Sequence, residues 1–237
     1  MSDTIIKATG LNKSFGNKQV LKNVSFTCKG GSIVGLLGPN GSGKTTLIKI
    51  LTGLITGYEG DVQINGHAIG VKTKETVSFL PDEPYFADWM KVKDALHIFA
   101  DLYRDFDYMR CLEIMQRFQI DERMRIKTMS KGTKEKFQLA LVMSRHAKLI
   151  VLDEPIGGVD PAAREVILDT ILSNYREDQT ILIATHLIAD IERIFDSVLF
   201  IKNGEIILDD NVEELRSETN KSIDELFREK FRGSKLS

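Results

Sequence analysis

The chain has 237 residues, enough to bury the core of one large domain or of one domain with a substantial insert. Lys and Arg total 32 against 34 Asp and Glu, and the resulting net charge of -2 argues against a generally basic nucleic-acid binder. The start "MSDTIIKATG" lacks a signal peptide's apolar core, and no run reaches the roughly 18 apolar residues of a membrane span. Cys28 and Cys111 form no CxxC pair, so we expect reduced thiols in a cytoplasmic protein.

The first predicted elements are two strands and a helix. "NVSFTC" alternates, which predicts a half-buried strand that ends at Gly30-Gly31 and has an apolar face of Val24, Phe26 and Cys28. The run "SIVGLL" is typical of a strand buried on both faces. After a glycine-rich loop, a helix is predicted from about Lys44, with leucines at helical spacing: Leu47, Leu51 and Leu54. "DVQING" indicates another strand and a turn.

The second half of the chain alternates helical and strand patterns. The pattern is helical from Trp89 to about Lys127, between predicted strands, so we predict an inserted helical subdomain over about 84–130. "KLIVLDEP" and "TILIATH" predict buried strands, and "SVLFIKNGEIILDD" predicts a hairpin around Asn203-Gly204, a favoured type I′ pair.

The last residues, about 211–237, are predicted to form a helical extension. Ser222 and Glu225 have capping-box spacing, and one helix face collects Ile223, Leu226, Phe227 and Phe231. We expect this helix to pack on its own domain. A dimer contact or a helix on a membrane surface is the alternative.

The stretch "GPNGSGKTT" satisfies G-x-x-x-x-G-K-[ST] between a buried strand and a helix. Glycines let the backbone wrap around a triphosphate, so that successive N–H groups point at its oxygens. Lys44 would reach the β- and γ-phosphates, and the Thr45 hydroxyl would ligate Mg²⁺. The predicted nucleotide-binding residues here are Gly38, Pro39, Asn40, Gly41, Ser42, Gly43, Lys44, Thr45 and Thr46.

Two strand ends carry further candidate residues. Asp153 and Glu154 end an apolar strand, where a carboxylate is costly unless something pairs with it. In P-loop NTPases the partner is magnesium, bound here by Asp153, and Glu154 would orient the attacking water. His186 ends the strand "ILIATH" and could hydrogen-bond the γ-phosphate. The alternatives are two solvated acids and a structural histidine.

The stretch "TMSKGTKEKFQLALVM" predicts a helix that Ser130 caps, yet its start carries the cations Lys131, Lys134 and Lys136. A helix N-terminus normally attracts acids, so one explanation is an anion from elsewhere that sits on this end. The other explanation is a solvated face. We favour a phosphate neighbour for Lys131 and a solvated face for Lys134 and Lys136.

From Phe15 to about Asp209, these motifs and their order resemble the ATP-binding subunits of ABC transporters. "GPNGSGKTT" is similar to the Walker A motif, "LIVLDEP" to Walker B with its catalytic glutamate, and "TH" to the switch histidine. "GGVDP" resembles the D-loop and gives Asp160, while "MSKGT" stands where the family has LSGGQ. Phe15 occupies the position of an aromatic that stacks on adenine, with Val20 against the ribose. The resemblance implies an α/β fold: a P-loop NTPase core with a mixed sheet, an antiparallel β subdomain and an inserted helical subdomain.

The resemblance also implies a mechanism. Two subunits, identical or different, would stack head to tail and trap two Mg-ATP molecules, with Ser130 and Gly132 of one subunit contacting the phosphate bound to the other. Lys44, Glu154 and His186 would carry out hydrolysis. A separate integral membrane permease would use the motion to move a substrate, and no nucleic-acid partner is expected. The ATPase would be cytoplasmic and peripheral to the membrane.

The sequence departs from the family pattern in two places. Lys131 and Thr133 replace glycine and glutamine in the signature, and "FLPDEP" has Asp82 where a glutamine usually helps to coordinate Mg²⁺. Glu83 is the alternative for that role. Both variants resemble exporter subunits. The next aromatics would either line a groove for a helix of the membrane subunit or belong to the core of the insert: Tyr85, Phe86 and Trp89.

Two rival functions belong to other classes. One is an ABC-type ATPase that acts on nucleic acid or the ribosome, although the chain has no sustained heptads and only one P-loop. The other is a nucleotide-sensing regulatory subunit that binds ATP and hardly turns it over.

Overall fold

The computed structural model describes residues 4–83 and 85–232. Residues 1–3, 84 and 233–237, which include the first residue of the predicted insert and the end of the predicted extension, lie outside the described residues. Within the described ranges, no helix combines the length and the apolar character needed to cross a membrane.

The N-terminal half forms a four-stranded antiparallel sheet in the order β2-β1-β4-β5. Its strands are β1 (Thr4–Phe15), β2 (Lys18–Lys29), β4 (Glu59–Ile64) and β5 (His67–Ala68). Alternate residues of β2 are buried, among them Val24, Phe26 and Cys28, which confirms the predicted half-buried strand.

The second sheet has six strands in the order β10-β9-β3-β8-β7-β6. They are β3 (Ile33–Leu37), β6 (Val77–Leu80), β7 (Leu149–Asp153), β8 (Thr180–Thr185), β9 (Ser197–Lys202) and β10 (Glu205–Asn211). Strands β9, β3, β8, β7 and β6 are parallel, and β10 pairs antiparallel with β9 through the predicted hairpin. This mixed sheet, the antiparallel subdomain and the helices around them confirm the predicted α/β fold class.

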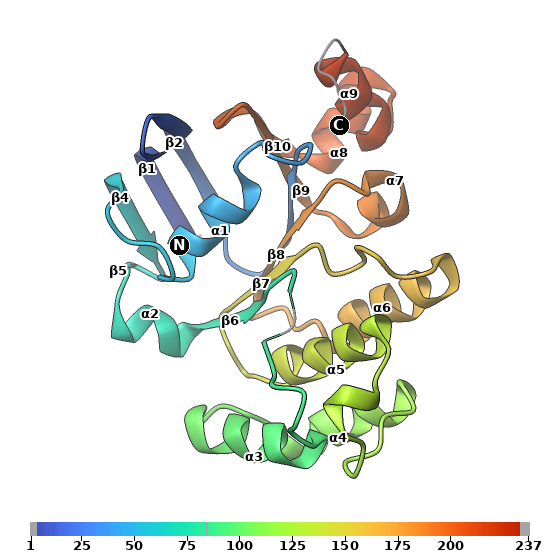
Figure 1. The fold of residues 1–237 in the computed structure, drawn as a ribbon. Helices are drawn as coiled ribbons and strands as arrows, with labels where there is room; N and C mark the ends of the chain where they lie inside the picture. The colour runs from blue at the N-terminus through green and yellow to red at the C-terminus, as the bar shows by residue number, and fades with distance from the viewer. Residues whose placement is uncertain (1–3, 84, 233–237) are drawn as a thin grey trace.

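The apolar side chains of the central strands divide between two cores, because successive residues of a strand face opposite sides. On one face, Val34 and Val151 pack with α1 (Lys44–Leu51) and the antiparallel sheet. On the other, Ile33 and Ile150 pack with helices from the rest of the chain. Those helices include α5 (Lys131–Met143), α6 (Pro161–Asn174) and α7 (Ile188–Ile191). Figure 1 shows α1 between the two sheets and the later helices across the large sheet.

The predicted insert contains α3 (Val92–Leu102), α4 (Tyr108–Arg117) and a short 3-10 turn (Ile126–Thr128) before α5. Apolar residues of these elements join the core that contains α5 and α6. A small helix, α2 (Val71–Thr76), precedes β6. The predicted continuation of α1 to Leu54 is wrong: Gly53 has a left-handed φ of 72°, which ends the helix, and Leu54 is 61% exposed.

The chain closes with α8 (Val212–Thr219) and α9 (Ile223–Phe231). The capping box of Ser222 and Glu225 is present, as predicted. The rings of Phe227 and Phe231 lie 5.5 Å and 6.2 Å from that of Phe200 in β9. The apolar face of α9 is therefore covered by its own domain. Figure 1 shows α8 and α9 at the opposite end of the molecule from α3 and α4.

One buried arginine joins the insert to the sheet. Arg145 follows α5, is only 2% exposed, and donates hydrogen bonds to the carbonyls of Glu75 (2.9 Å) and Val77 (2.7 Å). Its guanidinium also donates to both carboxylate oxygens of Asp105 (3.0 Å each) and lies 3.8 Å from the ring centroid of Tyr103. The end of α5, the entry to β6 and the link between α3 and α4 therefore meet at one side chain.

We predict that Arg145→Ala lowers the free energy of unfolding by about 3 kcal/mol, because it leaves Asp105 and two carbonyls without their charged partner. Urea unfolding with a constant slope would measure this loss. As a control, Lys148→Ala removes the exposed ion pair with Asp178 and should cost less than about 1 kcal/mol. Equal losses in the two variants would contradict the prediction.

Candidate active site

The carboxyl ends of the central parallel strands bring the predicted motifs to one edge of the sheet. Leu37 at the end of β3 pairs with Thr185 of β8, and Asp153 of β7 pairs with Ala184. The P-loop, the acidic pair and His186 therefore emerge side by side, at the edge where open α/β sheets bind ligands. A cavity of about 820 Å³ opens there. Its described lining consists of Phe15, Lys18, Gln19, Val20, Lys22, Asn40, Gly41, Gly43, Lys44, Thr45, Thr46, Asp82, Glu154 and Asn203.

The N-terminus of α1 forms one end of this cavity. Gly43 precedes the helix with φ 113°, a conformation that L side chains rarely adopt. Among the described residues no side chain caps this helix, and its first turn contains no acid. The first N–H groups of a helix have no intrahelical acceptor, so this end offers donors and a partial positive charge to an anion.

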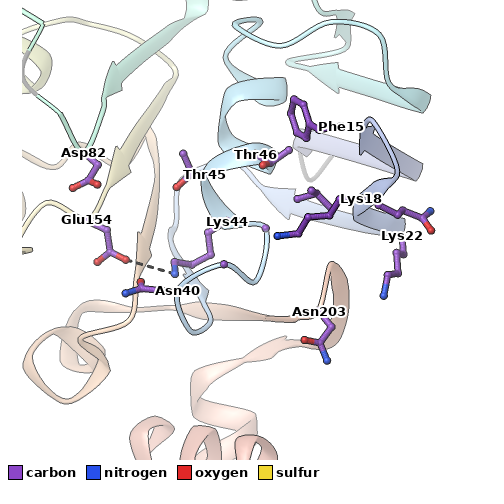
Figure 2. Close-up of a pocket in the computed structure, with 14 residues that line it drawn as sticks. Phe15, Lys18, Lys22, Asn40, Lys44, Thr45, Thr46, Asp82, Glu154 and Asn203 are labelled. Carbon is purple, nitrogen blue, oxygen red and sulfur yellow. Dashed lines mark ion pairs between the residues drawn. The ribbon is translucent and has the colours of Figure 1, made fainter. Parts of the chain in front are cut away.

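Lys44 lies across the P-loop. Its side chain is buried, and Nζ donates to the carbonyl oxygens of Gly38 (2.7 Å) and Pro39 (3.3 Å). Nζ also lies 3.6 Å from Oε1 of Glu154, an ion pair drawn in Figure 2. Burial lowers the pKa of Lys44, and the neighbouring carboxylates of Glu154 and Asp153 partly oppose this shift.

Asp153, at the end of β7, is only 2% exposed. Burial raises the pKa of its carboxyl to about 6, and a hydrogen bond from the neighbouring Thr45 hydroxyl acts in the opposite direction. Oδ1 of Asp153 and Oγ of Ser42 are buried and have no hydrogen-bond partner among the described residues. Buried polar groups almost always have partners, so unpaired oxygens on the P-loop and on the adjacent end of β7 are expected where a ligand or an ion completes the site.

Glu154 is held from three sides. Its backbone has a left-handed φ of 51°, and its N–H donates to the carbonyl of Ala184 (2.8 Å). Oε2 accepts a hydrogen bond from the Thr185 hydroxyl (3.0 Å), and Oε1 lies 2.9 Å from Nδ1 of His186. In this structure His186 therefore contacts Glu154, and its predicted bond to a γ-phosphate stays a prediction.

The other end of the cavity contains the predicted aromatic. The Phe15 ring is exposed, and Nζ of Lys13 lies 4.9 Å from its centroid. Val20 lines the same wall. Figure 2 shows Phe15 well apart from the acidic pair Asp82 and Glu154, so one cavity joins an aromatic end to a P-loop end.

Some cavity residues were absent from the sequence prediction: Lys18, Gln19, Lys22 and Asn203. The period of 2 in β2 could have indicated Lys18 and Lys22, because they share the face of Val20. The sequence predicted Asn203 as part of a hairpin turn and not as a residue of the cavity.

The turn that contains Asn203 and Gly204 is hydrogen-bonded to the P-loop. Gly204 donates its N–H to the carbonyl of Ser42 (2.9 Å) and accepts a bond from the N–H of Lys22 (2.8 Å). Its φ is 85°, and a Cβ at this position would lie 2.2 Å from the carbonyl oxygen of Val20. The hairpin turn therefore needs glycine, both for its conformation and for this close approach.

Eight predicted residues are not part of the described cavity lining: Gly38, Pro39, Ser42, Ser130, Gly132, Asp153, Asp160 and His186. Gly38 and Pro39 accept hydrogen bonds from Lys44, and His186 contacts Glu154, so these residues lie directly behind the lining. Ser130 caps α5, where Oγ accepts a bond from the N–H of Thr133 (3.2 Å). Asp160 caps α6, where Oδ1 accepts a bond from the N–H of Ala163 (3.0 Å). In the alternative left open at the end of β6, Asp82 lines the cavity and Glu83 does not.

The lysines of α5 behave differently from one another. Lys134 is not simply solvated, because Nζ pairs with Oδ1 of Asp88 at 2.8 Å. Nζ of Lys136 lies 6.0 Å from the ring centroid of Phe118. The Lys131 side chain is 65% exposed, and its one ion pair with a described residue is a long contact of 3.7 Å with Glu135.

Comparison with known proteins identifies the family. The model of the ABC transporter family matches residues 21–157. The uncharacterized ABC transporter ATP-binding protein YdbJ of Bacillus subtilis (strain 168) is 34% identical over 95% of this chain and 75% of its own length. The lantibiotic transport ATP-binding protein SrtF of Streptococcus pyogenes is 30% identical over 89% of this chain and 95% of its own length.

The fold comparison agrees. A solved structure described as the ATP binding subunit of an ABC transporter superposes with a TM-score of 0.86 and is 26% identical, over 95% of this chain and 99% of that one. The predicted family is therefore confirmed: the chain belongs to the ABC transporter family and carries its ATP-binding domain.

Proposed function

We propose that this chain is a Mg²⁺-dependent ATPase whose hydrolysis of ATP powers transport, in the direction of export, through a separate membrane subunit. The observation that carries the proposal is the set of unpaired polar groups at the edge of the sheet where the P-loop lies. Two buried oxygens without partners, on Asp153 and Ser42, adjoin the uncapped end of α1 and the ammonium of Lys44. A triphosphate with its cation supplies the partners that these groups need.

The donor set of this edge fits Mg²⁺. Thr45 and Asp153 would hold the ion, and Asp82 at the end of β6 would add an oxygen directly or through water. Mg²⁺ is commonly bound by one or two carboxylates together with substrate phosphates, which matches such a set. Elsewhere in the described chain, as at this edge, no three His, Cys, Asp or Glu side chains form a metal-binding group. When bound, the ion would neutralise charge on the phosphates.

Glu154 is the proposed base. A carboxylate fixed by Thr185, His186 and Lys44 has a defined orientation, and it faces the cavity in which the γ-phosphate would end. Glu154 would orient a water for in-line attack, while Lys44 and the P-loop N–H groups stabilise the transferring charge. His186 would exchange its contact with Glu154 for the γ-phosphate.

A second copy of the chain would complete the site. Ser130, Gly132 and Asp160 carry motif positions, and they lie at the starts of α5 and α6, outside the described cavity lining. We assign them to a nucleotide held by another subunit. The exposed ammonium of Lys131, at the start of α5, favours an anionic neighbour. We propose a head-to-tail dimer that closes over two nucleotides.

The aromatic segment before α3 supports a membrane partner. Phe86 packs in the insert, with its ring 6.2 Å from that of Phe99, whereas Tyr85 and Trp89 are 46% and 75% exposed. Phe86 therefore fits the alternative of a core residue of the insert, and Tyr85 and Trp89 fit the alternative of a groove for a partner helix. We propose that Tyr85 and Trp89 meet a cytoplasmic helix of the membrane subunit, which holds the ATPase at the membrane. Export is supported by the "LPDE" and "SKGT" variants and by the similarity to a lantibiotic transport protein.

We predict that Glu154→Gln still binds Mg-ATP and loses turnover by about 100-fold or more, because the amide is a poor base. Phosphate release and nucleotide titration would measure the two effects. Lys44→Ala is the matched control and should lose binding. Full turnover of Glu154→Gln, under conditions in which Lys44→Ala is inactive, would remove Glu154 from this role.

We predict that Asp153 makes the stability of the nucleotide-free chain depend on pH. The folded carboxyl, with its pKa raised to about 6, keeps its proton to a higher pH than the unfolded one, so stability falls as the pH rises from about 4 to 7. Asp153→Asn has no such carboxyl, so its free energy of unfolding should not show this loss. The free energy of unfolding of the variant minus that of the wild type should rise by about 3 kcal/mol between pH 4 and pH 8. Urea unfolding in EDTA would measure it, and parallel pH profiles would contradict it.

We predict that Glu154→Gln shifts from monomer to dimer only with Mg-ATP, as measured by light scattering. The double variant Glu154→Gln, Ser130→Arg should bind Mg-ATP normally and stay monomeric, because Ser130 does not line its own cavity. A Glu154→Gln chain that binds Mg-ATP and remains monomeric would overturn the homodimer and require a different second subunit.

A further inference from the structure

The wall between the two ends of the nucleotide cavity belongs to β2. At one end, the P-loop and Lys44 are arranged for the β- and γ-phosphates. At the other end, the Phe15 ring offers a flat face to a base. A nucleotide that spans both ends leaves its ribose near Val20 and its α-phosphate between Val20 and the P-loop, beside residues of β2 that the known motifs do not include.

Lys18 stands at this middle position. It pairs with Phe15 across the turn between β1 and β2, so the two side chains are neighbours on one face of the sheet. Val20 follows on the same face, and all three residues line the cavity. Figure 2 shows the Lys18 side chain extending from β2 toward the P-loop, whereas Lys22 extends toward the turn that carries Asn203.

The chemistry of Lys18 points to an anion. An ammonium has three donors and no acceptor, so its natural partner is a negatively charged oxygen. Within the described part of the chain, Lys18 makes no ion pair. The acids that line the cavity, Asp82 and Glu154, lie at the far side of the P-loop from it (Figure 2).

We propose that Lys18 binds the α-phosphate of the nucleotide. The inference rests on the proposed nucleotide site and adds a residue to it. Of the groups that would lie between the P-loop and Phe15, the α-phosphate alone is charged. ATP and ADP both carry this phosphate, so Lys18 contributes equally to both and does not sense hydrolysis.

The test is calorimetric titration of Mg-ATP and Mg-ADP into the full chain, with Lys18→Ala against the wild type at low and high salt. We expect affinity about five-fold weaker for both nucleotides, and a difference that shrinks as salt screens the charge. Lys18→Arg should restore most of the affinity. Lys29→Ala is the matched control, an exposed lysine of the same strand that does not line the cavity, and should bind as the wild type.

Three results would overturn the assignment. Wild-type affinity in Lys18→Ala would remove the contact. If Lys18→Ala lost affinity for Mg-ATP alone, the group that Lys18 contacts would be the γ-phosphate. If the loss of affinity did not change with salt, that group would be an uncharged ribose oxygen. Lys44→Ala separates this proposal from the proposed function. If Lys44→Ala loses Mg-ATP and Lys18→Ala does not, the nucleotide site stands and the Lys18 assignment falls.

Discussion

Lys44 and Asp153 are ionisable side chains that lie almost wholly out of water at one edge of a parallel sheet, and burial works against the charge of each. Such an edge is stable only if the surrounding structure is strong enough to hold it. The strands that support it, β3, β7 and β8, are buried along their whole length. The sheet therefore carries a locally unfavourable arrangement that a bound anion and its cation would relieve.

The two cores explain how one sheet serves several subdomains. Because alternate residues of each central strand enter different cores, the antiparallel sheet and α1 lie on one face, and the insert with the later helices lies on the other. The nucleotide cavity draws on both groups. Phe15 comes from the antiparallel sheet, Asp82 from the strand that leads into the insert, and Asn203 from the last hairpin. The cavity thus exists only when all of these elements are packed together.

Much of this was predictable from the sequence, because periodicity and turn chemistry are local. The buried strands, the P-loop helix and the capping box of α9 each follow from residues within a short window. What could not be predicted depends on contacts between distant residues. The approach of Gly204 to the P-loop, and the presence of Asp82 rather than Glu83 in the cavity lining, depend on how distant segments pack. The end of α1 before Gly53 is an exception, because a local residue causes it and the sequence prediction still missed it. The helical spacing of Leu47, Leu51 and Leu54 suggested a longer helix.

The hydrogen bonds of Arg145 determine which end of α5 is held in place. They fasten the last turn of α5 to the beginning of β6, whereas Ser130 stands at the other end of α5 and Asp82 just beyond the other end of β6. Helix α5 is 13 residues long, or about 20 Å at 1.5 Å per residue. Arg145 thus fastens the end of the helix that is farthest from Ser130. A tilt of the helix by about 5° about that end would move Ser130 by about 2 Å.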